Sequence, residues 1–180
     1  MVFRKGISIM KKSKKTAIIT ISVIVVLFII FNIFWLAYSQ VKFKPFKDSV
    51  GYSEERQEWY HREEDVVYSI SPPSYLSFNG NLSVTDVIKV DENGNLKKDT
   101  TCDLIIWLKF GGKIEYGFTI GVKQDDNKSY LNYFFMVDEN MNPTKKLAPD
   151  AEEVFESNKH IMEDKFKMAK KKWSNLTINL

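Results

Sequence analysis

The chain has 180 residues, with 26 Lys and Arg against 23 Asp and Glu, two His and a single Cys. One Cys excludes an intrachain disulfide framework, so the fold must be held by an apolar core. All six basic residues before Val41 stand without an acid, whereas residues 42–180 carry 20 basic and 23 acidic side chains. The net charge of +3 therefore arises at the N-terminus and does not indicate a nucleic-acid partner.

An uncharged, strongly apolar run extends from Thr16 to Tyr38, after a basic segment at residues 1–15. A helix needs about 20 residues to cross the bilayer core, and this run has that length. Excess Lys and Arg stay on the cytoplasmic side of a membrane. We therefore expect a single-pass cell-membrane protein with a cytoplasmic N-terminus and an extracellular C-terminal domain. Met10, directly before the Lys-rich stretch, is an alternative start to Met1.

The apolar run has a second interpretation, as a cleaved signal peptide. Ala37 and Ser39 satisfy the small-x-small rule, and a cut after Ser39 would release a secreted domain. The apolar core of a cleaved signal has about 7 to 15 residues, fewer than this run. Trp35 and Tyr38 also suit an interfacial aromatic belt at its outer end. We favour an uncleaved signal anchor at residues 16–38.

Residues 39–74 are interpreted as a stalk followed by a charge-dense segment. Residues 54–65 hold eight charged side chains, which a short helix capped by Ser53 would present to solvent. Residues 59–71 fit an extended conformation equally well. Ser71-Pro72-Pro73 then ends whatever precedes it.

Residues 75–180 are interpreted as one α+β domain that begins with a β-meander. Asn79-Gly80 indicates a tight turn, and period-two patterns predict strands at 82–90, 102–110, 114–122 and 130–137. Sequential strands with short connections form antiparallel sheets, here of about four to five strands.

The last predicted element is an amphipathic helix from Pro149 to about Trp173. Asp150 with Glu153 resembles a capping box. The residues of its apolar stripe are Val154, Phe155, Ile161, Met162, Phe166, Ala169 and Trp173. Because a sheet with one apolar face and a helix with one apolar stripe bury each other, we expect this helix to cover the sheet.

The register of one hairpin decides which strand face the helix covers. A two-residue loop at Gly111-Gly112 would set Trp107 opposite Tyr116 and Ile105 opposite Phe118, beneath the helix. A second apolar face then remains, and its residues are Leu104, Ile106, Leu108 and Phe110 beside Gly117 and Gly121. Either residues 53–78 cover this face or a partner protein or peptide does.

Catalytic and metal-binding patterns are weak in this chain. Cys102 lies within a predicted strand, where an inert thiol is the ordinary outcome, and neither His61 nor His160 has a clear set of metal ligands nearby. Asp91-x-Asn93-x-Asn95 and Asp138-x-Asn140-x-Asn142 resemble the start of a calcium loop. Both lack the Gly at position six and the Glu at position twelve, so we expect two turns, no metal and no cofactor.

These observations favour a non-enzymatic, membrane-anchored extracytoplasmic protein that binds a protein or peptide, for example as an accessory subunit of another membrane or cell-envelope protein. Two alternatives remain. One is a small-ligand sensing or carrier domain with an apolar pocket between sheet and helix, with the lining Trp107, Tyr116, Phe118, Tyr133, Phe135 and Trp173. The other is a cell-envelope enzyme, for which no catalytic constellation is evident.

Overall fold

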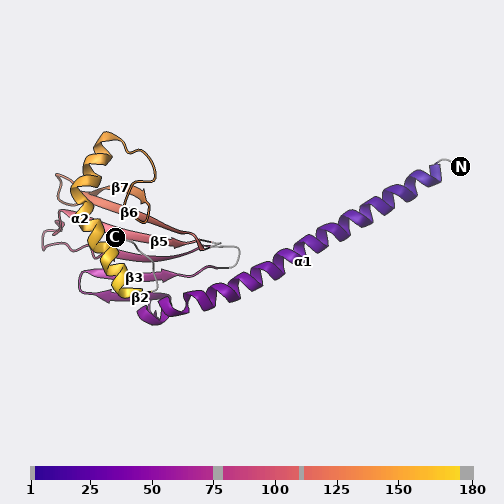
Figure 1. The fold of residues 1–180 in the computed structure, drawn as a ribbon, viewed down its shortest axis with the longest axis horizontal. Helices are drawn as coiled ribbons and strands as arrows, with labels where there is room; N and C mark the ends of the chain where they lie inside the picture. The colour runs from indigo at the N-terminus through magenta and orange to yellow at the C-terminus, as the bar shows by residue number, and fades with distance from the viewer. Residues whose placement is uncertain (1–2, 75–78, 110–111, 175–180) are drawn as a thin grey trace.

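The computed structural model describes residues 3–74, 79–109 and 112–174. They form one long helix, a seven-stranded sheet and a second helix (Figure 1). The elements in chain order are α1 (Phe3–Val50), β1 (Tyr52–Ser53), β2 (Glu58–Glu63), β3 (Val66–Ser71), β4 (Gly80–Asp86), β5 (Thr100–Leu108), β6 (Ile114–Lys123), β7 (Tyr130–Val137) and α2 (Pro149–Lys172). The predicted α+β class is confirmed.

The sheet is an antiparallel meander in which the strands lie side by side in sequence order, from β1 to β7. It has more strands than predicted because the charge-dense segment is extended and not helical. Trp59 pairs with Ile70 and His61 with Tyr68, so these alternate residues of β2 lie on the core side, whereas Glu58 and Arg62 lie on the other face. Glu64, with a φ of 48°, lies in the turn that joins β2 to β3.

The first helix, α1, runs without a break from the apolar segment into the domain. Its apolar part is long enough to cross a membrane or to act as a signal sequence: the window of mean hydropathy 3.0 is only 6% buried. At its other end Phe43, Phe46 and Val50 are buried in the core, where a stalk was expected. Gly51 ends the helix with a φ of 83°, and its N–H bonds the Lys47 carbonyl.

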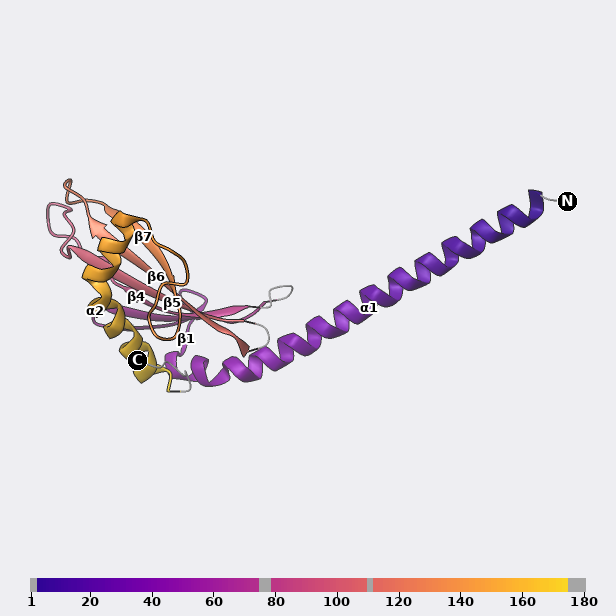
Figure 2. The same ribbon diagram turned by 45° about the horizontal axis from the view of Figure 1, so that its top comes forward.

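The second helix, α2, crosses one face of the sheet (Figures 1 and 2). The predicted stripe is confirmed, because Phe155, Met162, Phe166 and Ala169 are buried. The predicted capping box is wrong: the N-cap is Ala148, which makes no side-chain capping bond. Pro149 begins the helix instead, at a position where a missing N–H costs nothing.

The two Asp-Asn repeats form the same loop twice, as the turn prediction requires. The Asp91 carboxylate accepts the N–H groups of Asn93 and Asn95, and Asp138 accepts those of Asn140 and Asn142. These bonds lower the pKa of both Asp carboxyls. The carboxylates therefore close the loops themselves, after β4 and β7.

Candidate functional site: the open face and the free edge

The register between β5 and β6 differs by one residue from the prediction. Leu104 pairs with Phe118 and Ile106 with Tyr116, while Trp107 pairs with Glu115. The loop is longer than two residues: Leu108 pairs with Ile114, and the Lys109 N–H bonds the Lys113 carbonyl. A one-residue shift exchanges the two faces of a strand, so every expected facing of β5 was wrong.

The residues predicted to form a partner face do not share one surface. Leu104 and Ile106 are fully buried beneath α2 and Leu108 is 8% exposed, so all three belong to the core. Gly117 and Gly121 lie on the opposite face, because they pair with Ile105 and Thr101. Phe110 lies outside the described residues. The apolar face of β5 is thus covered by the chain's own helix.

The face turned away from α2, which we call the open face, carries an aromatic pair. The rings of Trp107 on β5 and Phe134 on β7 lie 6.3 Å apart, edge to face. They meet over Gly117, where an added Cβ would lie 2.6 Å from the Trp107 ring. Phe134 remains 56% exposed. The absence of a side chain at Gly117 therefore lets the two rings approach the sheet, and we call this partly exposed pair the aromatic shelf.

The last strand, β7, ends the sheet with an edge of eight residues, Tyr-Leu-Asn-Tyr-Phe-Phe-Met-Val, none of them charged. The Met136 carbonyl accepts the Thr144 N–H on the side away from β6. Because backbone directions alternate along a strand, the N–H and C=O groups of Asn132 and Phe134 also point away from β6. Natural edge strands are usually short, charged or interrupted by Pro. This one has none of those protections.

The opposite edge of the sheet is built differently. Its outermost strand, β1, has only two residues. The next strand, β2, carries three charged side chains among its six residues, Glu58, Arg62 and Glu63, and also holds His61. Tyr52 of β1 packs its ring on Trp59, with centroids 5.0 Å apart. A short, charged edge of this kind resists pairing with another chain.

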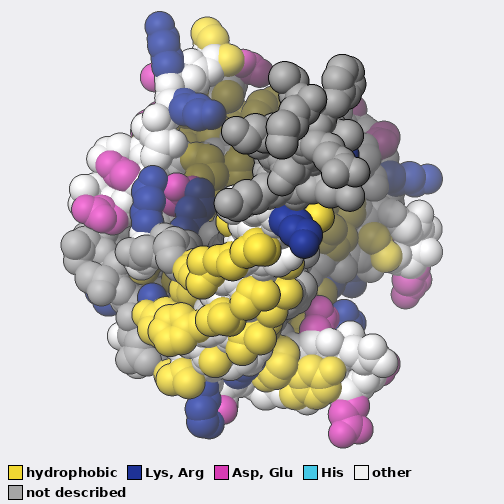
Figure 3. Space-filling model, turned by 90° about the vertical axis from the view of Figure 1, so that its right-hand side faces the viewer, with side chains coloured by type: hydrophobic (Ala, Val, Ile, Leu, Met, Phe, Trp, Pro, Cys, Tyr) yellow, Lys and Arg dark blue, Asp and Glu magenta, His cyan; other side chains and the backbone are white. Residues whose placement is uncertain are grey.

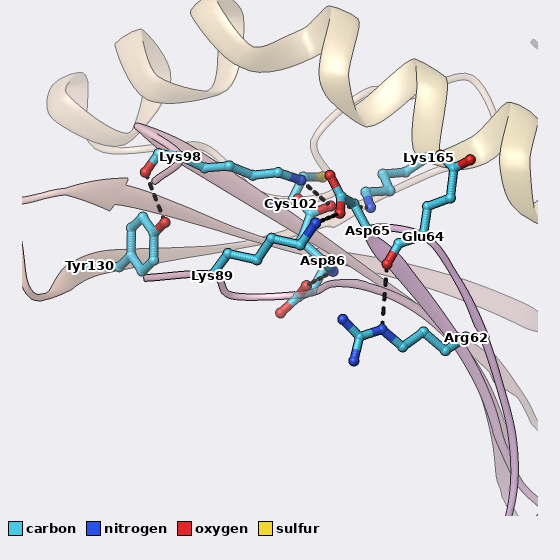
Figure 4. Close-up of polar contacts among 10 residues, drawn as sticks. Arg62, Glu64, Asp65, Asp86, Lys89, Lys98, Cys102, Tyr130 and Lys165 are labelled. Carbon is cyan, nitrogen blue, oxygen red and sulfur yellow. Dashed lines mark hydrogen bonds and ion pairs between the residues drawn. The ribbon is translucent and has the colours of Figure 1, made fainter. Parts of the chain in front are cut away.

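A buried cluster of charges joins α2 to the far end of the sheet (Figure 4). The Lys165 ammonium, whose side chain is 4% exposed, lies 2.8 Å from the Asp86 carboxylate, and Lys98 lies 3.2 Å from the same oxygen. The second Asp86 oxygen accepts the N–H of Cys102. Asp103 in turn accepts the N–H of Asp86. The cluster ties together β4, β5, the loop between them and α2.

The two carboxyls of this cluster have pKa shifts of opposite direction. Burial acts to raise the pKa of Asp86, but the bonds from Lys165 and from the Cys102 N–H outweigh it, so that this pKa is lowered. Burial raises the pKa of Asp103, and the single N–H bond from Asp86 does not offset it. Asp86 is thus held as a carboxylate by its cations, whereas Asp103 has none in contact.

A cleft of about 780 Å³ opens beside this cluster, between α2 and the β2–β3 turn. Its carboxylates are largely occupied by cations: Glu63 bonds Lys172, Asp65 bonds Lys89, and Asp164 bonds Lys167. Of these pairs, Glu63–Lys172 joins the sheet to α2, as Asp86–Lys165 does, and we therefore assign the cleft a structural role.

The residues considered for catalysis, Cys102, His61 and His160, do not form a catalytic arrangement among the described residues. Burial raises the pKa of Cys102 to about 12, which disfavours the nucleophilic thiolate. His61 pairs with Glu63 at 3.2 Å on the surface, and His160 is exposed on α2. Among the described residues, no group of three or more His, Cys, Asp or Glu side chains is placed to hold a metal ion.

Sequence reasoning missed the free edge and the buried ion pair. The uncharged composition of residues 130–137 was a readable signal for the edge, because a protected edge would carry Lys or Pro. No comparable signal existed for Asp86 and Lys165, which are 79 residues apart.

The chain matches no protein-family model, no curated protein and no solved structure.

Proposed function

We propose that this protein is a membrane-anchored extracytoplasmic domain that binds an extended segment of another protein along β7. The observation that carries the proposal is the uncharged eight-residue edge strand with its outward backbone groups at Asn132 and Phe134. Addition of a strand to such an edge supplies main-chain hydrogen bonds, and neighbouring side chains supply specificity. The aromatic shelf of Trp107 and Phe134 adjoins that edge.

The membrane anchor is supported by the exposed apolar side chains of α1. Ile18, Ile24 and Ile30 are each about 60% exposed, at 64%, 60% and 57%, which in water would be costly over so long a helix. A lipid environment removes that cost. The six basic residues before the run favour a cytoplasmic N-terminus. An uncleaved anchor also fits the unbroken course of α1 into the domain core.

The alternative of an apolar ligand pocket between sheet and helix receives less support. The rings of Phe118 and Phe166 lie 5.1 Å apart and those of Phe135 and Phe155 lie 5.3 Å apart, so aromatic side chains of both layers fill that space. Trp107, one of the residues expected to line the pocket, lies on the open face.

The test uses the full chain in its native membranes, with a photoreactive amino acid at position 134 in every variant. We expect a crosslink to a different polypeptide when position 132 is Asn, and we expect Asn132→Pro to abolish it. This Pro removes an outward N–H and leaves the bonds between β6 and β7 intact. Asn132→Ala, which keeps the N–H, is the matched control.

A photoreactive residue at Arg56, near the short edge, gives the background of the same measurement. Equal crosslinking at both edges, or equal crosslinking with Pro and Ala, would contradict strand addition. A product of twice the chain's own mass would instead indicate self-pairing along β7.

A further inference from the structure

One side of α1 is covered by the rest of the chain well inside the apolar run. Asn32, Trp35 and Ser39 are only 1%, 8% and 1% exposed, and their spacing of three and four residues places them on one face of the helix. On another side of the same helical turn, Phe34 is 69% exposed. The outer part of the apolar run therefore has one side against protein and the remaining sides free.

This covered face overlaps the segment that we expect to cross the membrane. Residues 16–31 are exposed on every side of the helix, but they provide only about 24 Å of helix length. The hydrocarbon core of a bilayer is about 30 Å thick. A bilayer core that begins at Thr16 therefore reaches past Asn32, and the part of the protein that covers Asn32 lies at the depth of the outer leaflet.

The polar side chains of this region lie on the covered side. The Asn32 amide N–H bonds the Phe28 carbonyl at 2.9 Å, and the Ser39 hydroxyl bonds the Leu36 carbonyl at 2.9 Å. Polar side chains in membrane helices usually face protein, because an amide in contact with hydrocarbon is costly. The burial of Asn32 and Ser39 is thus the pattern of a membrane helix that packs against protein on one side.

Tyr38 and Lys42 mark where the hydrocarbon ends along α1. The Lys42 ammonium lies 6.0 Å from the centre of the Tyr38 ring, and Tyr38 is 48% exposed. Tyr is enriched at the membrane interface, and Lys directs its ammonium toward the headgroups. Lys42 follows Tyr38 by four residues, about 6 Å along the helix axis. Because the polar layer of a bilayer is about 5 to 7 Å thick on each side, it corresponds to this stretch of helix.

One end of the sheet lies beside this part of α1. A hollow of about 80 Å³ separates Phe46 of α1 from Leu108 and Ile114, where β5 ends and β6 begins. At the start of β4, a Cβ added to Gly80 would lie 2.4 Å from the Phe43 ring. The strands run from this end away from the apolar run (Figures 1 and 2). Viewed from the N-terminal side of α1, apolar side chains gather at the centre with charged side chains around them (Figure 3).

We propose that this end of the sheet rests in the headgroup layer of the adjacent leaflet, so that the lipid surface is a binding partner of the domain. Lys113, whose side chain is 72% exposed, lies among the headgroups. The contact follows from position and not from charge, because the ammonium groups of Lys109 and Lys113 are both bound to Glu115. The proposal rests on the membrane insertion of α1 proposed above, and it is independent of any partner at β7.

The test measures how close the hairpin lies to lipid headgroups. The full chain carrying Lys113→Cys is labelled with a fluorophore and reconstituted into phosphatidylcholine vesicles. Cys102 is fully buried and does not compete for the label. A fraction of the lipid carries a nitroxide quencher, either on the headgroup or near the end of an acyl chain. We expect the headgroup nitroxide to remove most of the fluorescence at position 113, and the acyl-chain nitroxide to remove much less.

The matched control is Lys128→Cys, which also replaces an exposed lysine beside a turn. Lys128 lies in the next connection along the chain, between β6 and β7, at the opposite end of the sheet. The ten residues of β6 separate the two ends by roughly 30 Å. We therefore expect neither nitroxide to quench a fluorophore at position 128. Equal quenching at positions 113 and 128, or none at 113, would overturn the proposal.

A third label separates this proposal from the membrane anchor on which it rests. Ile24 is 60% exposed in the middle of the apolar run, so the acyl-chain nitroxide should quench a fluorophore at Ile24→Cys. Quenching at position 24 without quenching at 113 rejects the headgroup contact and keeps the anchor. No quenching at either position rejects both. Stronger quenching of position 113 by the acyl-chain nitroxide than by the headgroup nitroxide would place the hairpin in hydrocarbon, which also contradicts the proposal.

Discussion

The two faces of the sheet carry similar side chains that differ in burial and in ion pairing. On the covered face, Phe118 is fully buried against Phe166, and a carboxylate is neutralised by Lys165. On the open face, Phe134 is more than half exposed, and the carboxyl of Asp103 has no cation in contact with it. The difference shows that residue type alone does not identify the core, because one phenylalanine, Phe118, is buried in the core while another, Phe134, is exposed to solvent.

The largest expected difference between the faces comes from truncating one phenylalanine on each. Phe118→Ala should lower the free energy of unfolding by about 3 to 5 kcal/mol, since it leaves a cavity under α2. Phe134→Ala should cost under about 1 kcal/mol. Urea unfolding of the full chain in detergent, followed by near-UV circular dichroism, measures both. Equal losses would mean that the open face is part of the core.

Removing the cation of the buried pair should have an effect of similar size. Lys165→Met leaves the Asp86 carboxylate buried with only the more exposed Lys98, and we expect a loss of about 3 kcal/mol. The double variant Asp86→Asn with Lys165→Met should recover most of it, because no buried charge then lacks a partner. The same unfolding experiment provides the check, and additive losses would contradict the pairing.

Substitution of the two glycines that lie under aromatic rings, Gly80 and Gly117, should give a smaller difference in the free energy of unfolding. An added Cβ at Gly80 would lie 2.4 Å from the Phe43 ring and 2.7 Å from Pro73, both within the packed junction with α1. At Gly117 it would meet the outer edges of Trp107 and Phe134, which can turn toward solvent. Overpacking costs about 1 to 3 kcal/mol, and we place Gly80→Ala at the upper end and Gly117→Ala at the lower. Adding Trp107→Ala should rescue only the Gly117 variant.

The smallest predicted effect is an opposite pH dependence of two carboxyls. Asp86 has a lowered pKa in the fold, so its contribution to stability is present above its ordinary pKa of about 4 and is lost as pH falls through the folded value. Asp103 has a raised pKa, so its contribution is present below about 4 and is lost as pH rises through the folded value.

Unfolding measured at pH 7 and pH 3 in the Asn variants separates the two. Asp86→Asn should lose stability at pH 7 and lose less than the unmodified chain on acidification. The free energy of unfolding of Asp103→Asn should equal or exceed that of the unmodified chain at pH 7. This variant should lack the stabilisation that protonated Asp103 gives the unmodified chain at pH 3. The same pH trend in both variants would contradict the two assignments.

The sequence predicted the meander and the C-terminal helix well, because both have clear periodicity. The strand at residues 130–137 has the bounds that were expected. The pattern could not resolve β2, since its charged residues mask the alternation of Trp59 and His61. The one-residue error in the pairing of β5 with β6 has a different cause. Residues 104–108 are all apolar, so both faces of β5 are apolar and the pattern is compatible with either register. The length of the loop between Leu108 and Ile114 determines which register forms.

The candidate interaction surface was therefore placed on the wrong side of β5. The two residues of the aromatic shelf, Trp107 and Phe134, come from strands that are not neighbours, since β6 lies between them. The glycine at position 117 is what brings the two rings together, and a sequence pattern cannot distinguish that role from a turn or a bulge. The sequence pattern also did not predict the junction of α1 with the core. Phe43 and Phe46 lie between the apolar run and Gly51, a position that is equally typical of a stalk.

In the membrane-anchored form proposed above, the continuity of α1 with the core would fix how the domain is rotated about the helix axis. Each residue of an α-helix adds about 100° of turn and 1.5 Å of rise. One alanine inserted after Gln40 would thus rotate β7 by about 100° around the helix axis and move it by about 1.5 Å along that axis. A flexible tether would absorb such an insertion. In that anchored form the helix would set the direction in which β7 faces, and this would restrict the directions from which the proposed partner in the same membrane can reach the strand.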